Sequence, residues 1–301
     1  MELKFRIALL FFWVTQIHLV AQNNKKTTEE ITAKNESYLL TDVSFINDAV
    51  FMGRRDSISA PYLFPSVGYY DKSGFYVDLS ASYLTRTSEN RIDLILGSLG
   101  YIFEDKNLRG GISGTAYFFN EDSYNVKSEI VGDLSGFLSY DFDAIQTSIY
   151  AITFFNNAES ADVFVGIMLD RTFYTNNNTF LINLTATINI GSQYFYQEYY
   201  SSSRLGNRKG KGQGTEANLV ATNIEIKEAS KFKILSLEFS MPLQYYYKSY
   251  VFSFTPVLAV PQSPSTITTT DSIITEDLKN VFYFSVGIGY WFTTKKKKFL
   301  K

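Results

Sequence analysis

Apolar residues recur at every second position over much of the chain beyond Pro61. In the run 75–83, Phe, Val, Leu, Ala and Tyr alternate with Tyr, Asp and Ser. The runs 180–190 and 235–245 alternate in the same way. A period of two places successive side chains on opposite faces of a strand, whereas a helix would scatter both sets around its surface. The pattern therefore predicts β-strands.

Turn-rich breaks separate these alternating segments. Asp71-Lys72-Ser73-Gly74 offers a glycine for positive φ, and the three asparagines at 176–178 tolerate the left-handed region. Even spacing with short connections favours an up-and-down meander. We expect strands over 61–70, 75–86, 91–103, 109–119, 129–142, 145–155, 162–174, 179–196, 216–227, 232–247, 250–260 and 281–292.

The length of these segments distinguishes strands of a soluble sheet from strands that cross a membrane. Soluble strands typically run about 5–6 residues, whereas a tilted strand that crosses a membrane needs roughly 9–11. The segments reach the longer figure, and no helical pattern accompanies them to cover their apolar face. The predicted fold is all-β: a transmembrane antiparallel up-and-down β-barrel of about 12 strands, with lipid outside and a polar lumen.

The N-terminus has the three-part layout of a secretory signal peptide. Lys4 and Arg6 precede a largely apolar run from Ile7 to Val20, and Ala21 provides a small residue at which cleavage can occur. The alternative is a membrane anchor, but the run is shorter than the roughly 20 apolar residues of a spanning helix. We expect export to the cell outer membrane.

The chain therefore divides into four expected parts. Residues 1–21 are the signal peptide, 22–58 a periplasmic leader or possible plug, 59–292 the outer-membrane β-barrel, and 293–301 a Lys-rich tail. Within the second part, Leu39 to Met52 is apolar enough for a short helix or an extra strand. If both ends of an even-stranded barrel lie in the periplasm, the connections after odd-numbered strands are extracellular. Loop 261–280 would then be extracellular and loop 197–215 periplasmic.

Composition supports a membrane barrel. Aromatic residues make up 17% of the chain, with 22 Tyr and 26 Phe, which suits two interfacial aromatic girdles. There is no Cys, so no disulfide holds the exported fold together. A formal net charge of −2 excludes a strongly basic, nucleic-acid-binding surface.

The last predicted strand carries the most specific signal. Its alternate residues end in an aromatic, and the candidates for an assembly signal are Phe284, Val286, Ile288, Tyr290 and Phe292. Together with the Val-Ala-Gln signal end and the Tyr/Asn/Lys-rich composition, this strand makes the chain resemble the uncharacterised outer-membrane β-barrel proteins common in Bacteroidetes-type bacteria. The resemblance covers roughly Pro61 to Phe292. The resemblance implies the barrel-assembly machinery and outer-membrane lipid as partners, with a periplasmic or surface partner as a further expectation. The tail 293–301 departs from the family pattern, in which the aromatic is the final residue.

Residues for familiar catalysis are missing from the mature chain. His18 is the only histidine and leaves with the signal peptide, so neither a Ser-His-Asp triad nor a Cys-His pair can form. Zinc sites are disfavoured for the same reason. We expect no enzyme activity, no catalytic residue, no metal and no cofactor. The lumen-lining candidates are Asp78, Asp133, Asp170 and Glu238, which would favour cations if the lumen conducts.

Two functions remain open at this point. The leading hypothesis is a narrow pore or transporter for small solutes. The alternative is a non-conducting barrel acting as a structural, surface-binding or complex-anchoring protein. A charge test follows from the alternation: Leu237→Arg should hinder insertion because Leu237 faces lipid, and Ser236→Arg should be milder because Ser236 faces the lumen.

Overall fold

The computed structural model describes twelve stretches of the chain. They are residues 36–55, 60–86, 89–121, the single positions 123, 125 and 127, then 130–156, 161–175, 179–194, 225–227, 229–268 and 273–293. The expected signal peptide, loop 197–215, the 176–178 turn and all of the Lys-rich tail but its first residue lie outside them. Within these stretches, the structure has no helix both long and apolar enough to cross a membrane.

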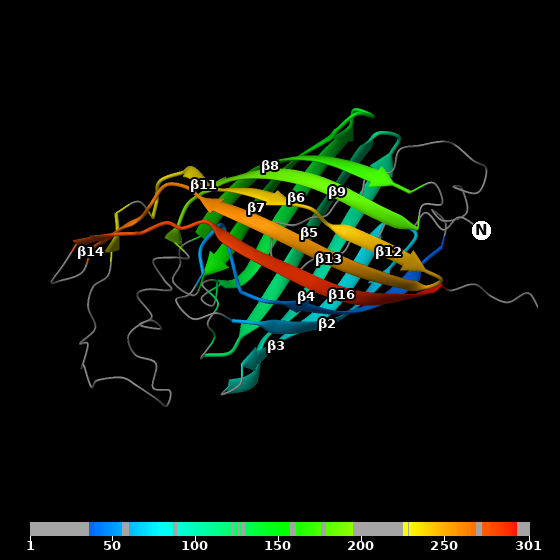
Figure 1. Cartoon of the computed structure of the whole chain (residues 1–301), viewed down its shortest axis with the longest axis horizontal. Helices are drawn as coiled ribbons and strands as arrows, with labels where there is room; N and C mark the ends of the chain where they lie inside the picture. Colours follow the sequence, from blue (N-terminus) through cyan, green and yellow to red (C-terminus); the bar gives the residue numbers. More distant parts are fainter. Residues whose placement is uncertain are drawn as a thin grey trace, which may run out of the picture.

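Antiparallel strands close into a barrel of twelve wall positions (Figure 1). Ten of the positions follow chain order from β1 to β9 and then β13, and β16 lies between β13 and β1 to close the ring. The remaining position, between β9 and β13, is shared by β11 and β12, because both pair with these two neighbours. The wall strands are β1 (Tyr38–Ile46), β2 (Tyr62–Tyr70), β3 (Phe75–Arg86), β4 (Glu89–Asp105), β5 (Leu108–Phe119), β6 (Ile130–Asp141), β7 (Gln146–Asn156), β8 (Ala161–Tyr174), β9 (Phe180–Gly191), β11 (Lys233–Ser240), β12 (Leu243–Tyr247), β13 (Tyr250–Pro261) and β16 (Val281–Thr293).

The predicted fold class and strand number are confirmed, but two segments differ from the prediction. Strand β1 lies inside the segment expected to be a leader, yet it forms part of the barrel wall. Of the two alternatives for Leu39 to Met52, the extra strand is therefore correct for the first half of that segment. The alternation of β1 is hidden in the sequence because Leu40 and Ile46 point inward while Thr41 points outward. The described residues of the segment expected at 216–227, which are 225–227, supply no wall strand, and β9 pairs directly with β11. Two residues of the segment form β10 (Glu225–Ile226).

Alternation identifies the lipid-facing side correctly in most strands. Phe75, Val77 and Leu79 point outward with half or more of their surface exposed. One position is wrong: Leu235 was expected on the same face as Leu237, yet it is fully buried inside the barrel. The pairing of β11 with β9 shifts register between Ile234 and Ser236, and this bulge turns Leu235 inward.

The two ends of the barrel differ in the length of their connections. At one end, short turns such as 106–107 and 248–249 join the strands; at the other, β9–β11 and β13–β16 are joined through 192–232 and 262–280. These two long connections meet in a small sheet of β10, β14 (Thr266–Thr268) and β15 (Ile273–Thr275). In Figure 1, β14 lies beyond the end of the barrel at which β11 begins.

This arrangement corrects the expected orientation. The β9–β11 connection, which contains loop 197–215, leaves and re-enters the wall at the same end as the β13–β16 connection. Counting β1 as wall moves the β9–β11 connection by one place, and the direct pairing of β9 with β11 cancels that shift for the later connections. Outer-membrane barrels have short periplasmic turns and longer extracellular loops. By this rule we expect the short-turn end to face the periplasm and the long-loop end to face outward.

Outward aromatic side chains form a girdle at each end. Those near the short-turn end are Tyr69, Tyr140, Tyr247, Tyr250 and Phe292, and those near the long-loop end are Tyr83, Phe118, Phe155 and Phe282. Amphipathic tyrosine rings favour the boundary between lipid and water. The girdles therefore mark the two surfaces of the membrane.

The predicted turn at Asp71–Gly74 is present between β2 and β3. The Asp71 carboxylate accepts hydrogen bonds from the Ser73 hydroxyl (2.5 Å), the Ser73 N–H (2.9 Å) and the Ser37 hydroxyl (2.8 Å). These bonds, those of Ser73 first, hold the pKa of Asp71 well below its usual value. Gly74 has φ of +100°, and a Cβ there would overlap the Ile102 carbonyl oxygen.

Gly74→Ala is expected to destabilise the barrel by roughly 2–4 kcal/mol, from left-handed backbone strain and the clash with a backbone atom. The matched control is Gly97→Ala in β4, where an added Cβ meets nothing within 4 Å. That variant should be neutral or slightly more stable. Denaturant unfolding in detergent, followed by tryptophan fluorescence, measures both. Equal stabilities would contradict this account of the turn.

Candidate functional site

The described residues of the connection between β1 and β2, 47–55 and 60–61, fold into the barrel; we call this connection the plug loop. Its tip is a tight turn in which Phe51 and Arg54 exchange two backbone hydrogen bonds of 2.8 and 2.9 Å. Met52 and Gly53 between them have φ of 51° and 74°, as in a type I′ turn. A Cβ at Gly53 would lie 2.8 Å from the Cβ of Pro261, so only glycine fits this approach to β13.

The tip of the plug loop crosses the lumen. Phe51 makes edge-on contacts with Phe154 and Phe164, at 5.7 Å between ring centroids in each case. Phe154 and Phe164 belong to β7 and β8, and β7 stands half-way around the ring from β1. Phe51, Met52, Phe154 and Phe164 are at most 1% exposed. An apolar cluster therefore closes the long-loop half of the lumen.

Buried polar contacts hold the plug loop in this position. One Asp48 carboxylate oxygen accepts the backbone N–H groups of Ala49 (2.9 Å) and Ala60 (3.0 Å). The Arg54 guanidinium donates to Glu276 (3.2 Å) and to the Ser263 carbonyl oxygen (3.1 Å). The two charged side chains of this pair are 1% and 11% exposed. Glu276 also accepts the N–H of Ser265 (3.0 Å), so the plug loop is tied to the β13–β16 connection.

A lysine from the β5–β6 connection completes the closure. The Lys127 ammonium lies 4.9 Å from the ring centroid of Phe51, 5.0 Å from that of Tyr117 and 5.1 Å from that of Phe154. Three ring faces around one cation supply favourable quadrupole interactions. Burial lowers the pKa of Lys127 to about 7, an effect that the negative charge of Asp133 opposes.

All four predicted lumen-lining acids point inward, but they do not line an open channel. Asp133, Asp170 and Glu238 are 7%, 2% and 3% exposed. Asp133 accepts the Tyr117 hydroxyl (2.7 Å). Asp78 and Glu238 stand elsewhere on the wall, on β3 and β11. The described residues hold no group of three or more side chains suited to a metal ion.

Sequence reasoning missed further interior polar groups. Asp42 of β1 is 6% exposed and faces the lumen, with β2 between it and Asp78 of β3. At the long-loop end, Asp93 accepts the hydroxyl groups of Tyr62 (2.5 Å) and Ser123 (2.6 Å). The alternation around Asp42 could have revealed it once 38–46 was recognised as a strand.

Inward aromatic rings also gather in the short-turn half of the lumen. The rings of Tyr38 and Tyr70 stack at 5.0 Å, and those of Tyr70 and Tyr76 stack at 5.6 Å. Trp291 from β16 packs with them at 2% exposure. Aromatic side chains from β1, β2, β3 and β16 therefore occupy one side of the short-turn half.

Ser236 corrects the expected charge test. It is fully buried; its hydroxyl donates to Glu238 (3.2 Å) and accepts from the Asn189 amide (2.9 Å). Ser236 faces inward as expected, but the interior around it is packed and leaves no room for an arginine side chain.

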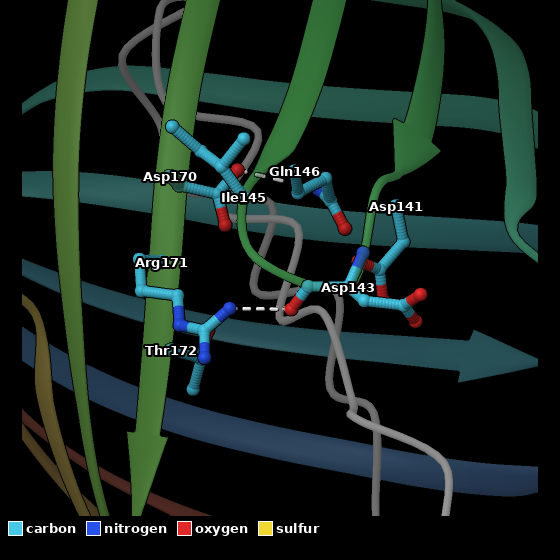
Figure 2. A pocket seen from close by; sticks show the side chains of 7 residues that line it. All are labelled: Asp141, Asp143, Ile145, Gln146, Asp170, Arg171 and Thr172. Atoms are coloured by element: carbon cyan, nitrogen blue, oxygen red, sulfur yellow. Dashed lines mark hydrogen bonds between the residues drawn. The ribbon is translucent and has the colours of Figure 1, made fainter.

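A small hollow opens at the rim of the short-turn end (Figure 2). Its volume is about 10 Å³, which is room for one water-sized group. Asp170 in its wall is held by Gln146 (3.3 Å) and Asn183 (3.4 Å). Arg171 donates a hydrogen bond to the carbonyl oxygen of Asp143, in the turn between β6 and β7.

The closed antiparallel wall, the apolar outer face and the two aromatic girdles together define an outer-membrane β-barrel protein. The protein lies in the cell outer membrane.

Solved structures of outer-membrane proteins resemble the chain in fold. The KdgM porin is 9% identical, with 83% of this chain and 98% of that one covered at a TM-score of 0.44. LpxR from Salmonella typhimurium is 10% identical, with 84% and 100% covered at 0.44. The anion-selective porin from Comamonas acidovorans is 7% identical, with 85% and 98% covered at 0.34. No protein-family model and no curated protein matches the sequence.

Proposed function

We propose that the barrel does not conduct solutes in this conformation and that it acts at the cell surface, where it holds the long connections in place. The contact of Phe51 with Phe154 and Phe164 across the lumen carries this proposal, because it joins opposite walls through buried apolar groups. Non-enzymatic binding or anchoring of a surface partner is the corresponding role.

The long-loop end has the features of a rigid platform. The sheet of β10, β14 and β15 joins two long connections, and the Arg54–Glu276 pair ties one of them to the plug loop. Ser265, in the same connection, donates to the side chain of Gln193 next to β9. Loops held by a rigid scaffold are frequent sites of recognition.

Conductance measurements test the proposal. The full mature chain, folded and inserted into planar bilayers, is expected to give no single-channel steps, and liposomes carrying it should not swell in small sugars. Heat-dependent gel migration of the same preparation verifies that the barrel is folded. Regular steps or swelling from folded wild-type protein would overturn the proposal.

A narrow pore or transporter for small solutes is the second candidate, and the interior polar band favours it. Asp42, Asp78, Asp133, Asp170 and Glu238 all point into the barrel, and such a set would select cations. This function requires the plug loop to leave the lumen.

Two expectations from the sequence remain predictions. The five candidate assembly-signal residues, Phe284 to Phe292, share the outward face of β16, which suits recognition by the barrel-assembly machinery. Membership of the Bacteroidetes-type barrels rests on the sequence resemblance alone.

A further inference from the structure

A furrow crosses the lipid-facing wall over β8, β9, β11, β13 and β16. Its volume is about 620 Å³, within the roughly 300–1,000 Å³ of ligand sites. Its lining is almost wholly apolar, and the residues that define it are Leu169, Leu184, Ala186, Phe239, Met241 and Leu258. Ala186 provides a low floor, and the wall is interrupted beside it at Met241–Pro242, between β11 and β12.

Strand register gives the direction of the furrow. Leu169, Ala186, Phe239, Leu258 and Phe282 are successive partners on neighbouring strands. Four gaps of about 4.8 Å make a length of about 19 Å, similar to one leaflet of a hydrocarbon core roughly 30 Å thick. The furrow begins near the short-turn end on β8 and rises to the long-loop end at Phe282, as an acyl chain from the periplasmic leaflet would run.

A cation stands at the lower end of the furrow. Arg171 points outward, since its guanidinium lies 5.8 Å from the ring of outward-facing Phe173. Tyr140 of the aromatic girdle, Thr147 and Leu169 are successive partners in the same rising row, so Leu169 lies above Tyr140. Arg171 is two residues nearer the short-turn end than Leu169, which brings it back toward the level of Tyr140. This places the Arg171 guanidinium at the level of lipid headgroups.

The rim hollow adjoins the furrow at this point. Ile145 and Arg171 line both of them, and the hollow adds Asp141 and Asp143 from the end of β6 and the turn that follows (Figure 2). The guanidinium of Arg171 and the carboxylates of Asp141, Asp143 and Asp170 therefore line the place where the apolar furrow meets the membrane surface.

We propose that the furrow and the rim hollow bind one phospholipid of the periplasmic leaflet whose headgroup carries both a phosphate and a primary ammonium. The phosphate accepts hydrogen bonds from Arg171, which has five N–H donors and uses one on Asp143. The ammonium, a water-sized group, enters the hollow beside Asp141 and Asp143. A headgroup with phosphate alone would meet the three aspartates of the hollow without a compensating cation. One acyl chain fills the furrow.

Native mass spectrometry of the folded, full mature chain tests the site. The protein is delipidated in detergent and titrated with phosphatidylethanolamine or with phosphatidylglycerol of the same acyl chains. Wild type should retain one phosphatidylethanolamine, with a preference of roughly three- to tenfold over phosphatidylglycerol, as expected for partly screened charge pairs. Equal retention of the two lipids, or retention of neither, overturns the proposal.

Variants locate the bound lipid. Ala186→Phe fills the furrow and should lower retention about tenfold or more through steric exclusion. The control is Ala116→Phe, which adds the same ring to the outward face of β5, away from the furrow, and should retain lipid like wild type. Arg171→Gln should weaken both lipids, and the double change Asp141→Asn with Asp143→Asn should remove the preference between them. Undiminished retention in folded Ala186→Phe overturns the proposal.

Discussion

Replacing residues 47–61 by Asn-Gly is expected to turn a silent barrel into a conducting one. Ile46 and Tyr62 are direct partners on β1 and β2, so a two-residue type I′ turn can join them without moving either strand. The replacement removes Phe51 and Met52 from the apolar cluster and leaves Phe154 and Phe164 facing an empty half-lumen.

The open barrel should pass small cations in preference to anions. Its conductance should be lower than that of porins with 16–18 strands, because barrel diameter grows with strand number. Reversal potentials in planar bilayers under a KCl gradient measure the selectivity. Phe51→Leu serves as the control: it keeps an apolar plug and should stay silent. A folded replacement that stays silent would show that the tyrosine-lined half also closes the lumen, and the pore candidate would then fail.

Ser236→Arg is expected to be the most damaging point change near the middle of the wall, and worse than Leu237→Arg. Leu237→Arg costs about 2–4 kcal/mol because it places a charge in lipid. Ser236 has no exposed surface, so an arginine there must displace packed neighbours and bury its charge, at a cost of more than about 4 kcal/mol. The adjacent Glu238 offsets part of the charge but provides no room.

Urea unfolding in detergent compares the two variants, and heat-dependent gel migration scores folding yield. Ser236→Ala is the matched control: it loses the hydrogen bonds to Glu238 and Asn189 but keeps the volume, and should cost roughly 1–2 kcal/mol. Wild-type stability for Ser236→Arg would mean that the interior is open at this level, contrary to the packing described above.

The outer face of the barrel was predictable from sequence because it depends on a local rule. Lipid demands an apolar side chain at every second position, and Phe75, Val77 and Leu79 obey it without reference to the rest of the fold. Strand β1 breaks the rule by placing Leu40 and Ile46 inward, where they join apolar clusters inside the barrel. The pattern there loses its contrast, and the strand was assigned to the leader.

The closed interior was not predictable, because it depends on contacts between distant segments. Nothing local to Phe51 shows that it will meet β7 and β8, about a hundred residues further along the chain. Inward tyrosines also fill space that the sequence pattern does not reveal. The Tyr150 ring lies over Gly166 on the neighbouring strand, where polar alternating positions would suggest a water-filled lumen. The acids were placed on the correct face, but the packing around them was not foreseen.

The seam between β1 and β16 sets the order in which the barrel can assemble. Its nine paired positions join residues near the two ends of the chain, and the Thr41 hydroxyl donates to the carbonyl oxygen of Tyr290. Neighbouring hairpins form through short loops, whereas this seam needs nearly the whole chain in place. Until it forms, β1 and β16 are unpaired edges open to other strands. A shortened chain that lacks Tyr38–Ile46 would leave the edges of β2 and β16 unpaired and should aggregate. The N-terminal strand is therefore required to close the barrel.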